Sequence, residues 1–87
     1  MNIIYVSAPW CGPCKMMKPV FNKFVEDNPG RFTSEIVDAD SNQELMQKYG
    51  VRNIPTFIFE KDGEVVEKMV GVISATKLEE TVAQYES

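Results

Sequence analysis

The chain has 87 residues, of which 44% are hydrophobic and 25% are charged, with two cysteines and no histidine. These values predict one small domain, residues 1–87, with a single core, and they argue against a disordered chain or a membrane protein. The net charge of −4 disfavours nucleic acid or an anionic membrane as a partner, because both bind basic patches. The N-terminus has no basic, apolar leader pattern, so a cytoplasmic location is expected.

The first predicted element is a buried strand, followed by a loop that carries both cysteines. Ile3 to Val6 is a continuous β-branched and aromatic run, which is typical of a central strand. Ser7-Ala8-Pro9 ends this strand. The segment Trp10-Cys11-Gly12-Pro13-Cys14 is therefore expected at its carboxyl end, where open α/β sheets place their sites.

The spacing of Cys11 and Cys14 suits a reversible disulfide. If a helix begins at Cys11, side chains three positions apart lie about 5–6 Å from each other, and disulfides typically join Cα atoms about 4.4–6.8 Å apart. The free N–H groups and positive dipole end of that helix favour a thiolate, so Cys11 is the expected nucleophile. Pro13 suits the first helical turn, and Gly12 lets a partner's backbone approach closely. The alternatives are one buried cysteine beside an uninvolved one, or an inert structural disulfide, although so short a loop gains little stability from a disulfide.

The helix that starts at Cys11 is predicted to continue to about Asp27, with a kink at Pro19. A polar strand over 32–37 is expected at an edge of the sheet. The segment Ser41-Asn42-Gln43-Glu44 matches a capping box and predicts the start of a short helix that ends at Gly50.

Two antiparallel strands are predicted at 54–59 and 64–70, joined by a hairpin turn at Lys61-Asp62-Gly63. Ser74 is expected to cap a last helix that covers the sheet. The order βαβαββα predicts an α/β fold in which three helices flank a four-stranded mixed sheet. No metal site is expected, because two cysteines without a histidine do not supply a usual zinc ligand set.

These motifs together resemble the thioredoxin family. The resemblance rests on Trp-Cys-Gly-Pro-Cys-Lys at 10–15, Ile-Pro-Thr at 54–56, and the Asp62-Gly63 hairpin followed by Gly71, and it covers nearly the whole chain. It implies a thioredoxin-like fold and a protein disulfide reductase or electron carrier, with Cys11 attacking and Cys14 resolving. The redox-active disulfide between them is implied to need no cofactor. Protein disulfides are the implied substrates and a thioredoxin reductase the implied electron donor, and we expect a monomer.

The resemblance also implies a surface that receives the partner protein. Its expected members surround the cysteines: Trp10, Gly12, Pro13, Ile54, Pro55, Gly71 and Val72. Pro55 is implied to be cis and to face the cysteines, whereas only about 5–6% of X-Pro bonds are cis in general. For Val72 and Ile73, packing in the core is the alternative, and Gly71 has the rival role of ending a strand.

The chain departs from the usual thioredoxin pattern beneath the cysteines. The family commonly carries a buried aspartate six residues before the first cysteine, where this chain has Tyr5, and the lysine that partners it corresponds to Ile36. A neutral tyrosine, with a reference pKa of about 10, is no carboxylate base near neutrality. Deprotonation of Cys14 is therefore expected to use water, another side chain or the departing thiolate of Cys11.

Thioredoxins also usually begin with a further strand and helix, whereas this sequence starts at the strand that leads into the cysteines. By analogy, its sheet is expected to have the strand order two, one, three, four, with the strand at 32–37 on the edge.

Two other functions stay open from the sequence. Short domains of this shape also resemble glutaredoxins, which depend on glutathione, although glutaredoxins usually have Pro-Tyr where this chain has Gly12-Pro13. The other alternative is a thioredoxin-fold binding subunit of a larger assembly. Binding alone would not require both cysteines and the Gly-Pro spacer.

Overall fold

Four strands form one mixed sheet in the computed structural model, which describes residues 1–86. The strands are β1 (Asn2–Ser7), β2 (Thr33–Asp38), β3 (Thr56–Lys61) and β4 (Glu64–Val70). They lie in the order β2-β1-β3-β4, with β2 parallel to β1 and the other two pairs antiparallel. The predicted strand order and the edge position of β2 are therefore confirmed.

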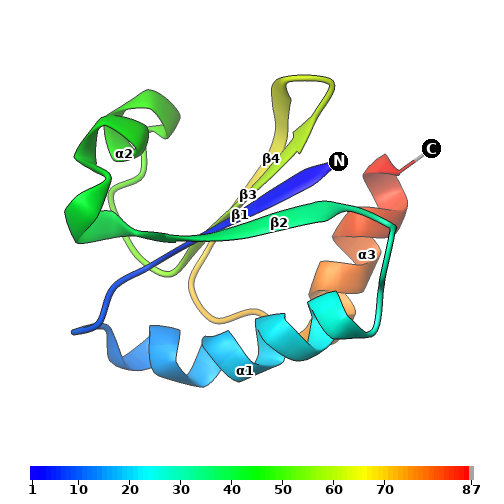
Figure 1. Ribbon diagram of the computed structural model, residues 1–87, viewed down its shortest axis with the longest axis horizontal. Helices are drawn as coiled ribbons and strands as arrows, with labels where there is room; N and C mark the ends of the chain where they lie inside the picture. The colour runs from blue at the N-terminus through cyan, green and yellow to red at the C-terminus, as the bar shows by residue number, and fades with distance from the viewer. Residues whose placement is uncertain (87) are drawn as a thin grey trace.

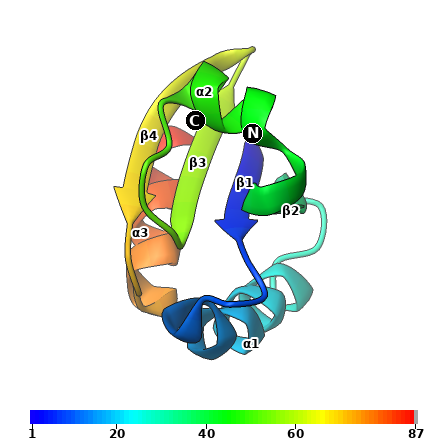
Figure 2. The ribbon, with the colours of Figure 1, turned by 90° about the vertical axis from the view of Figure 1, so that its left-hand side faces the viewer.

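Helices cover both faces of this sheet (Figures 1 and 2). α1 (Gly12–Glu26) and α3 (Ala75–Tyr85) lie on one face, and the short α2 (Gln43–Tyr49) lies on the other. α1 has its caps at Cys11 and Asp27, as predicted, and continues through Pro19 as one helix. In the part of the chain that the structure describes, no helix is both long and apolar enough to cross a bilayer.

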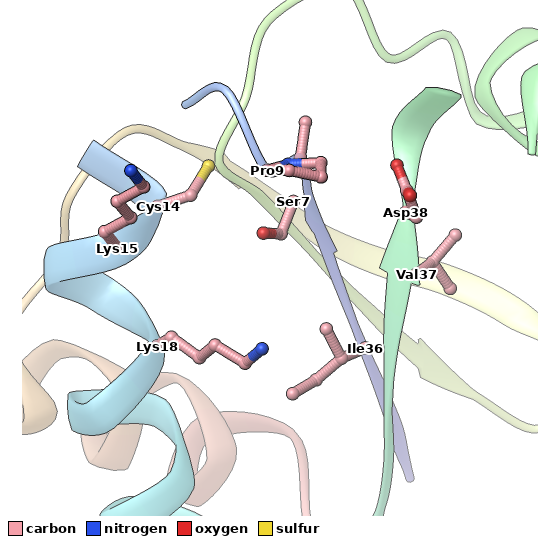
Figure 3. Close-up of a pocket in the computed structure, with 9 residues that line it drawn as sticks. Ser7, Pro9, Cys14, Lys15, Lys18, Ile36, Val37 and Asp38 are labelled. Carbon is pink, nitrogen blue, oxygen red and sulfur yellow. The ribbon is translucent and has the colours of Figure 1, made fainter. Parts of the chain in front are cut away.

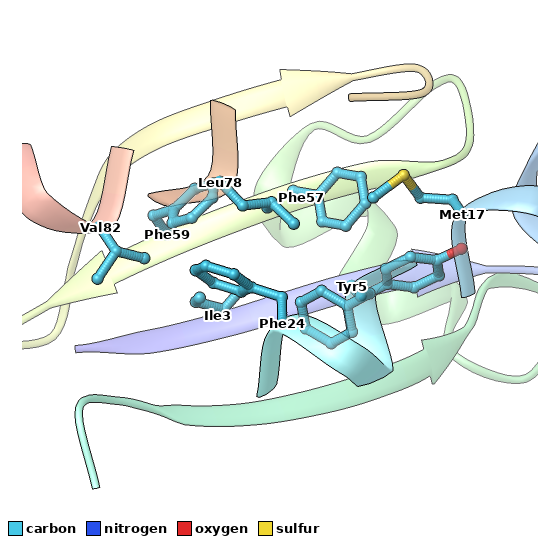
Figure 4. Packing of buried hydrophobic residues seen from close by; sticks show 9 residues of the cluster. Ile3, Tyr5, Met17, Phe24, Phe57, Phe59, Leu78 and Val82 are labelled. Atoms are coloured by element: carbon cyan, nitrogen blue, oxygen red, sulfur yellow. The ribbon is translucent and has the colours of Figure 1, made fainter. Parts of the chain in front are cut away.

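Side chains that alternate along β1 divide the core into two layers. Ile3 and Tyr5 face α1 and α3, whereas Ile4 and Val6 face α2, because successive residues of a strand point to opposite faces. β1 is thus buried on both sides, which explains its unbroken apolar sequence. The layer beneath α1 and α3 is the larger one (Figure 4), and it also contains Met17, Phe21, Phe24, Phe57, Phe59, Leu78 and Val82.

The start of α2 differs from the prediction. Ser41 does not cap this helix, because it belongs to a preceding 3₁₀ helix, η1 (Ala39–Ser41), and the N-cap of α2 is Asn42 without a side-chain capping bond. The cause lies upstream, where the carboxylate of Asp38 accepts a hydrogen bond from the backbone N–H of Asp40 at 2.9 Å and begins η1. The predicted capping box is therefore wrong.

The predicted turns are present, with small shifts of the strand ends. Gly50 ends α2 with φ of 65°, and Asp62 and Gly63, with φ of 54° and 81°, connect β3 to β4. Positive φ at both central positions is the geometry that two-residue hairpins favour. β2 begins one residue later than predicted, and β3 begins at Thr56, so Ile54 lies outside the strand pairing. Ser74 caps α3 as predicted, because its hydroxyl oxygen accepts a hydrogen bond from the backbone N–H of Lys77 at 3.1 Å.

Arg31 joins the loop before β2 to the C-terminal helix. Its guanidinium donates to both carboxylate oxygens of Glu79, at 2.7 and 2.9 Å, and to Glu86 at 3.0 Å. It also donates to the side-chain oxygen of Asn28. These bonds raise the pKa of Arg31 and lower that of the Glu79 carboxyl.

Candidate functional site

Cys11 and Cys14 form a disulfide at the N-terminus of α1, with their Cα atoms 5.3 Å apart. Cys11 is the N-cap of the helix, and its Sγ accepts a hydrogen bond from the backbone N–H of Cys14 at 3.2 Å. The sulfur of Cys11 is therefore at the positive end of the helix, where a thiolate is stabilised. Both residues are nearly closed to solvent, with Cys11 4% and Cys14 1% exposed.

The residues expected to surround the disulfide differ in exposure. Trp10 and Val72 are open to solvent, 68% and 56% exposed, and Gly12 and Pro13 are exposed as well. Ile54 is half-buried and packs against the cluster that contains both cysteines. Core packing, the alternative for Val72, is wrong; the neighbouring Ile73 is the residue that packs against the core.

The peptide bond between Ile54 and Pro55 is cis, as the resemblance implied. The Pro55 ring is fully buried, so this residue is not part of the exposed surface through its side chain. Its carbonyl accepts a hydrogen bond from the backbone N–H of Gly71 at 2.8 Å. Gly71 has φ of 98°, a conformation that favours glycine. This bond brings the start of β3 and the end of β4 together.

Sequence reasoning missed Asp40, which the structure places beside Trp10. The indole Nε1 of Trp10 donates a hydrogen bond to Oδ2 of Asp40 at 2.8 Å. A signal for this contact exists in the predicted topology. β1 and β2 are parallel neighbours, with Ser7 opposite Asp38, so the segments that follow them leave the sheet at the same edge.

Tyr5 lies against the first turn of α1. Its hydroxyl donates a hydrogen bond to the backbone carbonyl of Cys14 at 2.9 Å, and its ring packs edge-on against Phe57 with centroids 4.7 Å apart. Burial raises the pKa of Tyr5, and a hydrogen bond with the Ser7 side chain offsets part of this rise. Tyr5 is therefore protonated near neutrality and does not act as a base for Cys14, in agreement with the sequence.

A cavity of about 330 Å³ lies next to Cys14, between α1 and β2 (Figure 3). In Figure 3 the Lys18 side chain extends from α1 toward Ile36 on β2. Ile36 is 44% exposed. The lining is formed by Ser7, Ala8, Pro9, Cys14, Lys15, Lys18, Ile36, Val37 and Asp38. Within residues 1–86, no group of three or more His, Cys, Asp or Glu side chains is arranged to hold a metal ion.

A CxxC disulfide at a helix N-terminus, a cis proline and this strand order together define a thioredoxin-like dithiol–disulfide oxidoreductase. The family model for Thioredoxin matches residues 1–84. The chain belongs to the thioredoxin family. Its chemistry is carried by the redox-active disulfide, and thioredoxins need no added cofactor.

Individual relatives agree with this assignment. The chain is 45% identical over 78 residues to the thioredoxin of Bacillus subtilis, covering 90% of this chain and 75% of that one. It is 36% identical over 78 residues to thioredoxin 1 of Nostoc sp., and this match covers 90% of this chain and 73% of that one. Among solved structures, a mutant thioredoxin from Halobacterium salinarum superposes with a TM-score of 0.90 at 35% identity, covering 99% of this chain and 74% of that chain. The structure of Malassezia sympodialis thioredoxin superposes with a TM-score of 0.87 at 36% identity, and the match covers 99% of this chain and 75% of that chain.

Proposed function

We propose that this chain reduces disulfides in partner proteins, with Cys11 as the nucleophile and Cys14 as the resolving thiol. The assignment of roles rests on the position of Cys11 as the N-cap of α1, where its sulfur accepts a hydrogen bond from the backbone N–H of Cys14. Cys11 is also the more exposed of the two residues.

The exchange takes two displacements. The Cys11 thiolate attacks a partner disulfide, which forms a mixed disulfide and releases one partner thiolate. Cys14 then loses its proton and attacks Sγ of Cys11. This second step restores the Cys11–Cys14 disulfide and releases the other partner sulfur as a thiolate, which takes up a proton. One partner disulfide is reduced and one dithiol of this protein is oxidised.

The partner surface proposed here consists of residues that lie around the disulfide. Trp10 and Val72 supply exposed apolar contacts, while Gly12 and Gly71 leave room for a second backbone. Ile54 lies outside the pairing of β3, so its backbone suits an extended partner segment that binds like an added strand. Pro13 and the backbone of Pro55 complete this surface.

The oxidised protein needs an electron donor, for which we propose a thioredoxin reductase, the usual donor of the family. A reducing compartment such as the cytoplasm suits this role, because it keeps the cysteine pair available as a dithiol. We further propose that residues 1–87 act as one domain and as a monomer.

Serine variants of the two cysteines test the proposed roles in a matched pair. Reduction of a protein disulfide, with dithiothreitol or a thioredoxin reductase as donor, should be lost in Cys11→Ser. Cys14→Ser should instead accumulate a mixed disulfide between Cys11 and the partner, visible by non-reducing electrophoresis and mass spectrometry. Full activity of Cys11→Ser, or no trapped species with Cys14→Ser, would contradict the assignment. Turnover with glutathione and none with a thioredoxin reductase would instead favour the glutaredoxin-like alternative.

A further inference from the structure

The second displacement leaves one group unassigned, namely the acceptor of the Cys14 proton. The thiolate, not the thiol, is the nucleophile in disulfide exchange. Cys14 is 1% exposed, so its proton has no direct route to bulk solvent. Tyr5 is excluded as the acceptor, because its hydroxyl is protonated near neutrality and already donates to the Cys14 carbonyl.

The cavity next to Cys14 brings together the titratable and charged groups that face this residue. Lys15 and Lys18 come from α1, Tyr5 lies beneath on β1, and Asp38 comes from the end of β2. Asp38 is the one carboxylate in the lining, and its Oδ1 accepts the backbone N–H that begins η1. Figure 3 shows the Asp38 carboxylate on the opposite side of the cavity from Cys14, so it is not placed to take the proton directly.

Lys18 is placed to act on the Cys14 thiolate through the cavity. The two residues are four positions apart on α1, so they lie on the same side of the helix. Figure 3 shows the Lys18 amino group within the space between α1 and β2 rather than directed away from the protein. Lys18 is exposed to solvent, and its amino group lies beside Ile36 in the same cavity that Cys14 lines. A positive charge in the cavity that a thiol lines favours the ionised form of that thiol.

Ser7 provides a polar partner for water in the same space. Its hydroxyl points into the region between the strands and α1 in Figure 3, and its side chain also contacts the Tyr5 hydroxyl. A water occupies about 30 Å³ in the liquid and needs two to four polar partners. The cavity of about 330 Å³ is large enough, and its lining contains the polar groups of Ser7 and Lys18, which the Cys14 thiol joins once the disulfide is reduced.

We propose that this cavity is the proton exit of Cys14, in which Ser7 positions the water that accepts the proton and Lys18 stabilises the thiolate that remains. The Cys14 S–H bond breaks, the water carries the proton to solvent, and the sulfur electron pair forms the bond to Sγ of Cys11. The mixed disulfide bond breaks at the same time, and its electron pair leaves on the partner sulfur. Ser7 and Lys18 are positioning residues in this step.

The experiment isolates the second displacement and rests on the proposed role of Cys14. Reduced protein is mixed with one equivalent of dithiobis(nitrobenzoate) by stopped flow across a pH series. The first coloured thionitrobenzoate to be released reports the attack by Cys11, and the second reports resolution of the mixed disulfide by Cys14; this second release is the quantity compared between variants. Lys18→Gln removes the charge at similar size, and Lys18→Arg restores it. Lys23→Gln is the matched control, because it makes the same charge change on α1 at a side chain that pairs with Asp27 and is not among the residues lining the cavity.

Lys18→Gln should move the pH midpoint of release upward by roughly 0.5–1 unit and slow release at neutral pH by roughly three- to tenfold. Lys18→Arg should restore the wild-type midpoint, and Lys23→Gln should leave it unchanged. Ser7→Ala should slow release across the pH range with little change in midpoint.

Two outcomes separate failure of this proposal from failure of the proposed function. If the wild type releases thionitrobenzoate but Lys18→Gln keeps its midpoint, or if Lys23→Gln shifts it equally, the role of Lys18 is overturned. If Ser7→Ala releases at the wild-type rate, the role of Ser7 is overturned. A wild type that shows no second release of thionitrobenzoate would overturn the resolving role of Cys14 itself.

Discussion

The indole N–H of Trp10 donates a hydrogen bond to the carboxylate of Asp40 across 2.8 Å, between residues thirty positions apart in the chain. Trp10 is 68% exposed, and this bond is the polar contact that holds its ring in one orientation next to Cys11. Asp40 lies in η1, so the segment after β2 contributes to the surface beside the disulfide although it carries no cysteine.

Asp40→Ala should therefore weaken the binding of partner proteins. Without its acceptor, the Trp10 ring has more conformational freedom to lose on docking. A hydrogen bond worth about 1 kcal/mol corresponds to roughly a fivefold rise in KM for a protein disulfide. The rate with a small aromatic disulfide should stay the same. Fluorescence of Trp10, the single tryptophan, reports its changed surroundings. Glu44→Ala is the control for loss of a nearby negative charge, and an equal rise in KM there would assign the effect to charge.

Tyr5→Phe should lower the free energy of unfolding by about 1 kcal/mol. The phenylalanine keeps the ring packing against Phe57 but removes the buried bond to the Cys14 carbonyl, and such bonds contribute about 0.5–1.5 kcal/mol each. Urea unfolding of the oxidised protein measures the difference. An unchanged midpoint would show that the Cys14 carbonyl is fully satisfied within the helix.

Stability should fall in alkali through the three tyrosines. The pKa of Tyr5 is raised by burial, and those of Tyr49 and Tyr85 are raised by hydrogen bonds to Glu60 and Glu67. The native state therefore keeps these protons to higher pH than the unfolded chain does. Their contribution is complete below the unfolded pKa of about 10 and is lost as pH rises through the native values.

Urea midpoints between pH 8 and 11 test this dependence. The urea midpoint should stay constant near pH 8 and fall above pH 10, and this fall should be shallower in Tyr5→Phe than in the wild type. The same slope in both proteins would mean that groups other than Tyr5, such as the lysines, determine the alkaline loss.

Two glycine variants should separate stability from docking. Gly12 begins α1, and an added Cβ there meets no atom within 4 Å, so Gly12→Ala should stabilise the fold by about 0.5–1 kcal/mol. Gly71→Ala should destabilise it by about 1 kcal/mol or more, because φ of 98° is strained for alanine. Both variants should reduce protein disulfides more slowly than the wild type, since both methyl groups lie on the proposed partner surface. If Gly12→Ala reduced protein disulfides at the wild-type rate, Gly12 would lie outside the proposed partner surface.

Arg31→Ala should lower the thermal midpoint, because it removes the bonds that join Glu79 and Glu86 of the C-terminal segment to the loop before β2. Arg31→Lys should restore only part of the loss, since an ammonium group does not reproduce the two parallel bonds to Glu79. Thermal scans at low and high salt are the measurement. The difference from the wild type should shrink in high salt, and a difference independent of salt would point to lost packing.

The sequence predicts the element order and the disulfide because both depend on local patterns. The apolar run at 3–6, the glycine turns and the Cys11–Cys14 spacing carry their geometry within a few residues. The capping box at Ser41 fails because a competing side chain, Asp38, begins η1 three residues earlier. Contacts such as Tyr5 to Cys14 and Trp10 to Asp40 depend on how elements meet in space, so no local pattern predicts them.

β1 occupies the centre of the sheet although it is the first element of the chain, and this has a consequence for synthesis on the ribosome. Its partners β2 and β3 end at residues 38 and 61, so on a nascent chain the edge of β1 that pairs with β3 stays open until most of the domain has been made. Both long-range pairings require closure of large loops before burial of β1 offsets the cost. Folding should therefore be late and concerted, and β1 should be the segment most exposed to aggregation before β3 emerges.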